Sequence, residues 1–446
     1  MMEGASEKTI NRLQLRVAKN HLDSLRVFII CLVTVCAIFS QPLFFSFAGL
    51  VGYEYGGAEN SRIFHRYTIL VFILIALVYI WSFAEKAVLS RAEIGFYVFF
   101  LYILSNHMFW VVLDRDTKLW TENLAVFLGI GITGFFAARV IHSFDVWHGV
   151  IRLVELIVVF ISIGLIVAIV QPVFSGVSVR GIGGASYQQA SYYAALCFGL
   201  LGLATFRLEG EFRYKICRTW LFTILNIILM LGLFVATIVN GGRGAFLLMM
   251  SYLFMALFWI STKGGMTYRG ILRFAVVVVF FSVFVFVGFR ELIENPVVSA
   301  GFNRAVSFLG DFEHGRIDLG GEVGGRDKVY ALALRGISES PLIGFGVFGS
   351  WETLTHPHNL FLDLAIQFGL PVTFVLVLVV GWSMLVRLRT MDTRKVWLLT
   401  ISLYPSISLM FSSGYLRTAV FWFVLAGILF IGPSRVAVDL QSARCR

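Results

Sequence analysis

The sequence predicts an all-α, polytopic membrane protein with about twelve transmembrane helices and one long extramembrane loop. Two observations support this prediction. Apolar residues make up 58% of the 446 residues and charged residues only 14%, whereas a soluble domain carries charge on about a quarter of its residues. The apolar residues also gather into runs close to the ~20 residues that a helix needs to cross a bilayer. This composition excludes a disordered chain and a secreted disulfide scaffold, and it disfavours a soluble enzyme.

Twelve apolar runs are expected to be spans. They lie near 27–50, 67–84, 92–113, 122–139, 151–171, 190–206, 219–239, 242–261, 271–289, 359–386, 396–413 and 415–432. The chain then divides into a basic tail (1–26), nine spans (27–289), a long loop (290–358), three spans (359–432) and a second tail (433–446).

Basic residues predict the orientation of the bundle. With the N-terminus in the cytoplasm, the segments on that side hold 23 of the 36 Lys and Arg residues, which is the positive-inside pattern. Both tails are then cytoplasmic and the long loop lies on the outer side. The net charge of +10 is therefore expected to reflect topology, and no nucleic-acid partner is implied.

The long loop has the pattern of an ordered segment. Apolar residues at helical spacing predict amphipathic helices at about 297–309 and 326–338. Glycines alternate with bulky apolar residues over 340–349, which predicts a tight loop tucked against the membrane face. Since long ordered loops are usually lids or sites, a functional role is favoured over a passive cap.

Polar residues gather where the tenth span should begin. Pro357 disfavours helix at His356, so the span is expected to start near His358 or Asn359, with His358 at the outer mouth of the bundle. A neutral imidazole can serve as a general base, and Asn359 or His356 could orient it, with Asp363 as a further supporting residue. A zinc site that uses both histidines is possible, with Asp363, Glu352 and His314 as further ligands, but the spacing of the two histidines does not match helical zinc motifs.

Three arginines on the outer side have glycine neighbours: Arg180, Arg243 and Arg326. A charge held this close to lipid is costly and usually functional. The guanidinium fork matches phosphate oxygens, so two or three arginines at one mouth could neutralise a diphosphate. If they stabilise a departing diphosphate while His358 takes the proton of a sugar hydroxyl, glycosyl transfer needs neither metal nor cofactor and inverts the anomeric centre.

These residues, in this order, resemble the O-antigen ligase and polymerase superfamily of bacterial envelope glycosyltransferases. The family signature is a His followed by Asn, nine residues and a Gly, which His358, Asn359 and Gly369 fit. Arg243 stands in the family's Arg-Gly turn, and Arg180 resembles its earlier Arg-x-x-Gly loop. The resemblance covers roughly 175–380 and includes a large loop between the ninth and tenth spans.

The resemblance implies a GT-C-like glycosyltransferase of the bacterial inner membrane with its active site facing the periplasm. The donor would be a glycan on undecaprenyl diphosphate, and the acceptor a lipid A-core or another glycan, so ligase and polysaccharide-polymerase activities both remain open. The family roles make His358 the base and place Arg180, Arg243 and Arg326 on the diphosphate. A transporter of lipid-linked glycans or anions is the alternative function, and a non-enzymatic envelope scaffold is a third.

Overall fold

The computed structural model describes most of the chain. The described residues are 23–51, 58–86, 89–112, 124–174, 181–182, 185–208, 210–262, 294–296, 298–303, 326–347, 357–387, 392–412 and 414–430. Predictions for the two tails beyond these limits, for the ninth run (271–289) and for much of the long loop lie outside the described residues.

The described chain is almost entirely helical, as predicted. Its helices are residues 23–38, α2 (Ser40–Leu50), α3 (Ala58–Glu85), α4 (Arg91–Val112), the π-helical turn η1 (Phe127–Gly131) that leads into α6 (Ile132–Phe144), α7 (Trp147–Phe174), α8 (Tyr187–Phe206), η2 (Gly210–Phe212), η3 (Ile216–Arg218), α9 (Trp220–Asn240), α10 (Arg243–Thr262), α14 (Arg326–Glu339), α15 (Leu360–Arg387), α16 (Thr393–Phe411), η5 (Tyr415–Arg417) and α17 (Ala419–Phe430). The short strands β1 (Gly181–Ile182) and β2 (Ala185–Ser186) pair antiparallel.

Seven described helices are long and apolar enough to cross a membrane, and an eighth span results if residues 23–38 and α2, bent by 83°, count as one. The chain is therefore an all-α polytopic membrane protein. Within the described residues this number is smaller than twelve: the ninth run lies outside them, and Arg243–Ala256 of α10 and Ala419–Phe430 count only as shorter apolar helices. The count of twelve stays a prediction.

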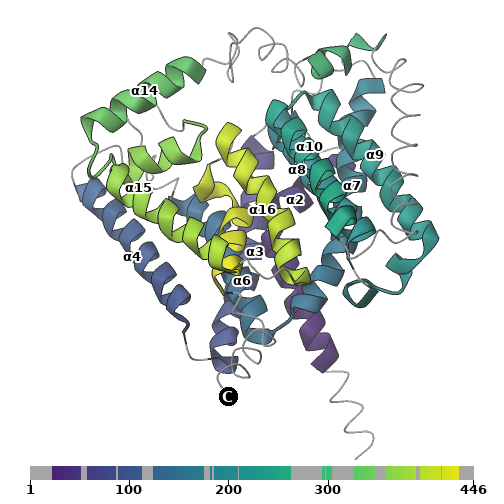
Figure 1. Ribbon diagram of the computed structural model, residues 1–446, viewed down its shortest axis with the longest axis horizontal. Coiled ribbons are helices and arrows are strands. Elements are labelled where there is room, and N and C mark those ends of the chain that lie inside the picture. The colour runs from purple at the N-terminus through teal and green to yellow at the C-terminus, as the bar shows by residue number, and fades with distance from the viewer. Residues whose placement is uncertain are drawn as a thin grey trace, which may run out of the picture.

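The helices form two groups joined by α16. Figure 1 shows α4, α14 and α15 on one side and α7 to α10 on the other, with α16 between them. α8 lies at the centre of the second group, where it contacts α7, α9, α10 and α16. α17 packs mainly on α6 and also contacts α15 and α16, so the C-terminal helices connect the two groups.

Glycines permit the closest helix pairs, as is common in membrane bundles. A Cβ at Gly134 of α6 would lie 2.7 Å from the backbone nitrogen of Phe423 on α17. A Cβ at Gly199 of α8 would lie 2.5 Å from the ring of Tyr252 on α10. Lipid supplies no hydrophobic driving force between helices, so the van der Waals contacts that this close approach permits stabilise the helix pairs.

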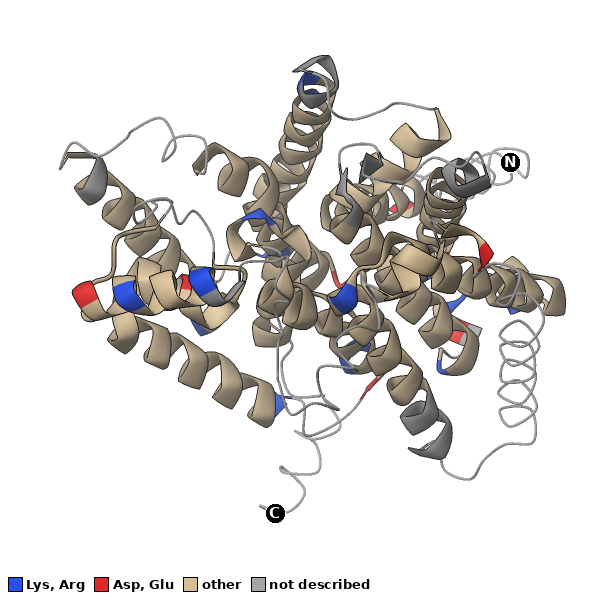
Figure 2. Ribbon diagram, turned by 90° about the horizontal axis from the view of Figure 1, so that it is seen from above, with Lys and Arg blue, Asp and Glu red and all other residues tan. Residues whose placement is uncertain are grey.

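Charged side chains are sparse on the helices (Figure 2), and some of them are buried. Arg139, counted above among the cytoplasmic topology charges, is fully buried and forms an ion pair with the buried Glu93. Arg213 is buried as well, beside Glu155. Each of these two arginines neutralises an acid within the bundle, and their place on the cytoplasmic side stays a prediction.

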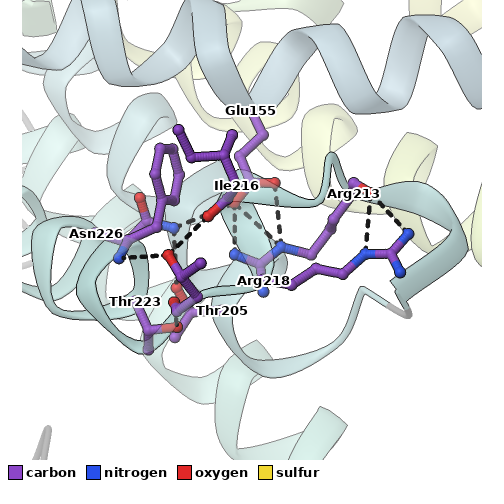
Figure 3. Close-up of polar contacts among 9 residues, drawn as sticks. Glu155, Thr205, Arg213, Ile216, Arg218, Thr223 and Asn226 are labelled. Atoms are coloured by element: carbon purple, nitrogen blue, oxygen red, sulfur yellow. Dashed lines mark hydrogen bonds and ion pairs between the residues drawn. The ribbon is translucent and has the colours of Figure 1, made fainter.

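The Glu155 cluster fastens the segment between α8 and α9 to the bundle (Figure 3). The Arg213 guanidinium donates to both Glu155 oxygens at 2.7–3.2 Å, and the Asn226 side chain donates to the same carboxylate at 3.3 Å. Arg218 donates to the Arg213 carbonyl at 3.1 and 3.2 Å. Burial, and then the nearby Glu155, raise the pKa of the Cys217 thiol to about 12. The cluster links α7 to α9 and to η3.

Candidate functional site

The tenth predicted span is broken near its start. Gly369 has φ 78° and ψ 169°, which is not a helical conformation, and Pro371 follows two residues later. The break divides α15 into a first arm (360–368) and a second arm (370–387). Residues 363–368 of the first arm are buried, whereas the second arm exposes large apolar side chains such as Phe374. The span expected over 359–386 agrees with α15, which is long and apolar enough to cross a membrane, but Gly369 and Pro371 interrupt its helical hydrogen bonds near the start.

The loop 340–346 supplies the hydrogen bonds that the break removes. In an unbroken helix, residues 370 and 371 would donate to the carbonyls of Ile366 and Gln367. Pro371 has no N–H, and Leu370 donates instead to the Pro341 carbonyl at 2.8 Å. Phe345 N–H donates to Ile366 at 2.7 Å and Gly346 N–H to Gln367 at 3.1 Å. The described part of the predicted loop, 340–347, is a tight turn that pairs with the break in α15, and its position against the membrane face stays a prediction.

Two glycines make this contact possible. A Cβ on Gly369 would lie 2.5 Å from the carbonyl carbon of Leu342, and one on Gly344 would lie 2.5 Å from the Ile366 oxygen. Gly344 also has a positive φ of 67°. The Gly of the family signature is therefore needed both for its backbone conformation and for the approach of the loop.

Asn359 caps the first arm. Its Oδ1 accepts hydrogen bonds from Phe361 N–H at 3.0 Å and Leu362 N–H at 3.2 Å, which is the N-cap arrangement. The span was expected to start near His358 or Asn359, and α15 begins at Leu360. Since the Asn359 oxygen is used by the helix, this residue supports its neighbour by fixing the helix start.

His358 lies directly before this cap with φ 54°, a left-handed conformation that is uncommon for a residue other than Gly. Its side chain is half-buried, and the Nδ1 atom is buried. The second histidine of the predicted pair, His356, lies outside the described residues. Glu352 and His314 of the alternative zinc site also lie outside them.

A hydrogen-bond chain holds the first arm against the last helices. The Gln367 amide donates to Asp363 Oδ1 at 2.8 Å, and the Tyr415 hydroxyl donates to Gln367 Oε1 at 2.6 Å. Trp422 of α17 donates to the Tyr415 carbonyl at 3.0 Å. Asp363 was expected to support the site, and it is buried in this chain. The sequence prediction missed Gln367 and Tyr415; the i, i+4 spacing from Asp363 could have indicated Gln367.

Arg243 is the first residue of α10, after a turn of glycines. α9 ends at Asn240, and Gly241 adopts φ 66° as its C-cap. A Cβ on Gly242 would lie 2.9 Å from the Cβ of Ser191, and one on Gly244 would lie 2.8 Å from the Tyr192 ring. The glycines therefore bring the Arg243 turn against the beginning of α8.

The two strands that follow Arg180 in the sequence lie at the same end of α8. Arg180 lies outside the described residues, but β1 follows it directly, and β2 continues into α8. Both strands contact α8. Ser191, which meets the Arg243 turn, lies five residues after Ser186, or about 7.5 Å along a helix. The fold thus brings the end of this hairpin and the Arg243 turn to one end of α8.

Two further contacts involve the Arg243 turn and the first arm of α15. A Cβ on Gly244 would lie 3.2 Å from the Cβ of Phe411 at the end of α16, and the chain continues from there to Tyr415, which bonds to the first arm of α15. α14 begins at Arg326 and packs on the first arm through Ala333 and Ile337. The Arg326 side chain lies outside the described part of the structure.

Comparison with known proteins finds a similarity that covers part of the chain. Residues 227–377 match the family model described as O-antigen ligase. The match begins within α9 and ends within the second arm of α15, so it includes Arg243, Arg326, His358 and Asp363. A search of curated proteins found no match.

Proposed function

We propose that this chain, whose residues 227–377 match the O-antigen ligase family model, transfers a glycan from an undecaprenyl-diphosphate donor to a sugar hydroxyl. The family links the chain to glycosyl transfer in the synthesis of O-antigen or a related polysaccharide, with a lipid-linked glycan and a membrane as its context. The acceptor is a lipid A-core or a second glycan. The reaction takes place on the periplasmic side of a bacterial inner membrane, with both termini in the cytoplasm.

The observation that supports this function most directly is the arrangement around His358. Its backbone is left-handed, Asn359 caps the helix that follows, and the hydrogen bonds of Asp363 and Gln367 fix that helix to Tyr415. A general base must be held within hydrogen-bond reach of the proton it removes, and these contacts restrict the position of the His358 backbone.

In the proposed reaction, the acceptor hydroxyl attacks the anomeric carbon as His358 removes its proton. The bond from that carbon to the diphosphate breaks, and the new glycosidic bond forms on the opposite face, with inversion. Arg243 and Arg180, with Arg326 as a third ligand, neutralise the charge that develops on the leaving diphosphate. His358 then releases its proton to water, so the step is balanced without a metal or an organic cofactor.

The test uses His358→Ala and Arg243→Ala in a strain that lacks the chromosomal gene. Matched controls are His65→Ala and Arg62→Ala, since both residues are exposed near the start of α3. We expect normal amounts of membrane-inserted protein in all four variants and a loss of glycan transfer only in the first two, by about 10²- to 10⁴-fold for the base.

Full transfer activity in either site variant would contradict the assigned roles. Activity that disappears with EDTA would instead favour a metal site, and flux of a lipid-linked glycan without a new glycosidic bond would favour a transporter. The glycans of the deletion strain separate the possible acceptors. Accumulated lipid-linked polymer indicates a ligase, single attached repeats indicate an O-antigen polymerase, and intact lipopolysaccharide without exopolysaccharide indicates an exopolysaccharide polymerase.

A further inference from the structure

An apolar surface lies at the C-terminal end of α14 and on the loop that follows it. Leu334 is 59% exposed, Leu342 70% and Ile343 61%. These residues belong to the segment 290–358, which the sequence predicts to lie outside the membrane. Three large apolar side chains are thus exposed within the ten residues 334–343, and apolar exposure concentrated in one segment indicates a partner more strongly than scattered single residues do.

The exposed half of α14 is divided between apolar and charged residues. Ala333 and Ile337 face α15 in a small apolar cluster. Successive residues of a helix are about 100° apart, which places Leu334 and Ser338 on one flank of the exposed half and Arg335, Lys328 and Glu339 from its centre toward the other flank. Arg335 and Glu339 form an exposed ion pair at 3.1 Å. A helix with this pattern suits the boundary between water and acyl chains.

The patch continues into a surface that already faces lipid. The loop is hydrogen-bonded to the break in α15, and a Cβ on Gly369 would touch Leu342 and Ile343. The second arm begins directly after Gly369. Its first residue, Leu370, is 50% exposed, and Phe374, one turn later, is 65% exposed. The second arm belongs to a helix long and apolar enough to span a membrane, so its exposed apolar side chains contact acyl chains.

We propose that α14 and the loop tip form an interfacial element that lies in the outer leaflet of the bilayer. Leu334, Leu342 and Ile343 insert among the acyl chains, whereas Lys328 and Arg335 face water at the level of the head groups. The break in α15 is then located where the element meets the second arm. The exposure of these apolar side chains, the charges on α14 and the continuity with the second arm support lipid as the partner, whatever reaction the protein catalyses.

The test measures the depth of single positions in proteoliposomes. Spin labels are placed at Leu342→Cys and Leu334→Cys in the full chain after the five native cysteines are replaced by alanine. The matched control among the charged residues of α14 is Arg335→Cys, and Phe374→Cys is the reference for contact with lipid. We expect labels at 342 and 334 to collide with oxygen rather than with a water-soluble nickel complex, as at 374. The label at 335 should show the opposite preference.

Access of the nickel complex to position 342 equal to that at position 335 overturns the proposal. Exclusion of both reagents from position 342 also overturns it, and would indicate that a second copy of the chain covers the patch. If the cysteine-free chain does not fold, p-benzoylphenylalanine is incorporated at 343 or 335 of the otherwise native protein. Irradiation should then attach phospholipid at 343 at least ten times more often than at 335, and equal attachment is the contrary result.

Discussion

Gly369→Ala should break the connection between α15 and the loop 340–346. The combination of φ 78° and ψ 169° at Gly369 belongs to a region that is almost exclusive to glycine and costs about 1–3 kcal/mol for another residue. The new Cβ would also lie 2.5 Å from the Leu342 carbonyl carbon and 2.8 Å from the Ile343 nitrogen. Both are backbone atoms, so the loop must move away.

The expected loss of free energy of unfolding follows from the contacts that require the loop 340–346 to lie close to Gly369. Three backbone hydrogen bonds join the loop to the break, and each contributes about 0.5–1.5 kcal/mol when its groups are satisfied. Together with the conformational cost, the substitution should reduce the free energy of unfolding by roughly 2.5–7.5 kcal/mol. The first arm should lose its fixed direction, and glycan transfer should fall with it.

Gly381→Ala is the matched control, because it lies in the second arm of the same helix and a Cβ there would meet nothing within 4 Å. Alanine is the better helix former, so this variant should equal or exceed the native protein in stability. The two variants are compared by their unfolding temperatures in detergent and by their transfer activities in membranes. Equal unfolding temperatures and equal activities for the two variants would refute the role assigned to the break.

Two other predictions concern buried polar contacts. Tyr415→Phe removes the donor to Gln367 and leaves a buried acceptor without it, so thermal unfolding should show a loss of about 1–3 kcal/mol. Tyr102→Phe, at a half-exposed position, should show little change. Glu155→Leu or Arg213→Met should each cost about 3–5 kcal/mol, because each leaves a buried charge unpaired, whereas the double variant should recover much of that loss. Additive losses in the double variant would contradict the buried pairing.

The local patterns predicted several elements closely. The predicted helix at 326–338 is α14 (Arg326–Glu339), since its apolar residues repeat at helical spacing. Of the helix expected at 297–309, the structure describes residues 298–303, and these are helical. The expected start of the tenth span agrees with α15, since Pro357 and Asn359 act through their nearest neighbours.

The candidate site was predicted less completely. Spacing identified His358, Asn359 and Gly369, but it did not indicate what Gly369 contacts. Its partner, Leu342, is 27 residues away in the sequence. Tyr415 lies 48 residues from Gln367, and no periodicity connects such positions.

Composition and the apolar runs of about 20 residues together predicted an all-α membrane protein, because a chain so poor in charge belongs in a bilayer and runs of that length suit helices that satisfy their own backbone groups. Charge counts also predicted an orientation. Only the tertiary structure decided which charges are buried in pairs, as for Arg139 and Arg213. It also decided which groups of the loop 340–346 form hydrogen bonds with the backbone at the break in α15. Both outcomes depend on contacts between distant segments, which local patterns of residues do not encode.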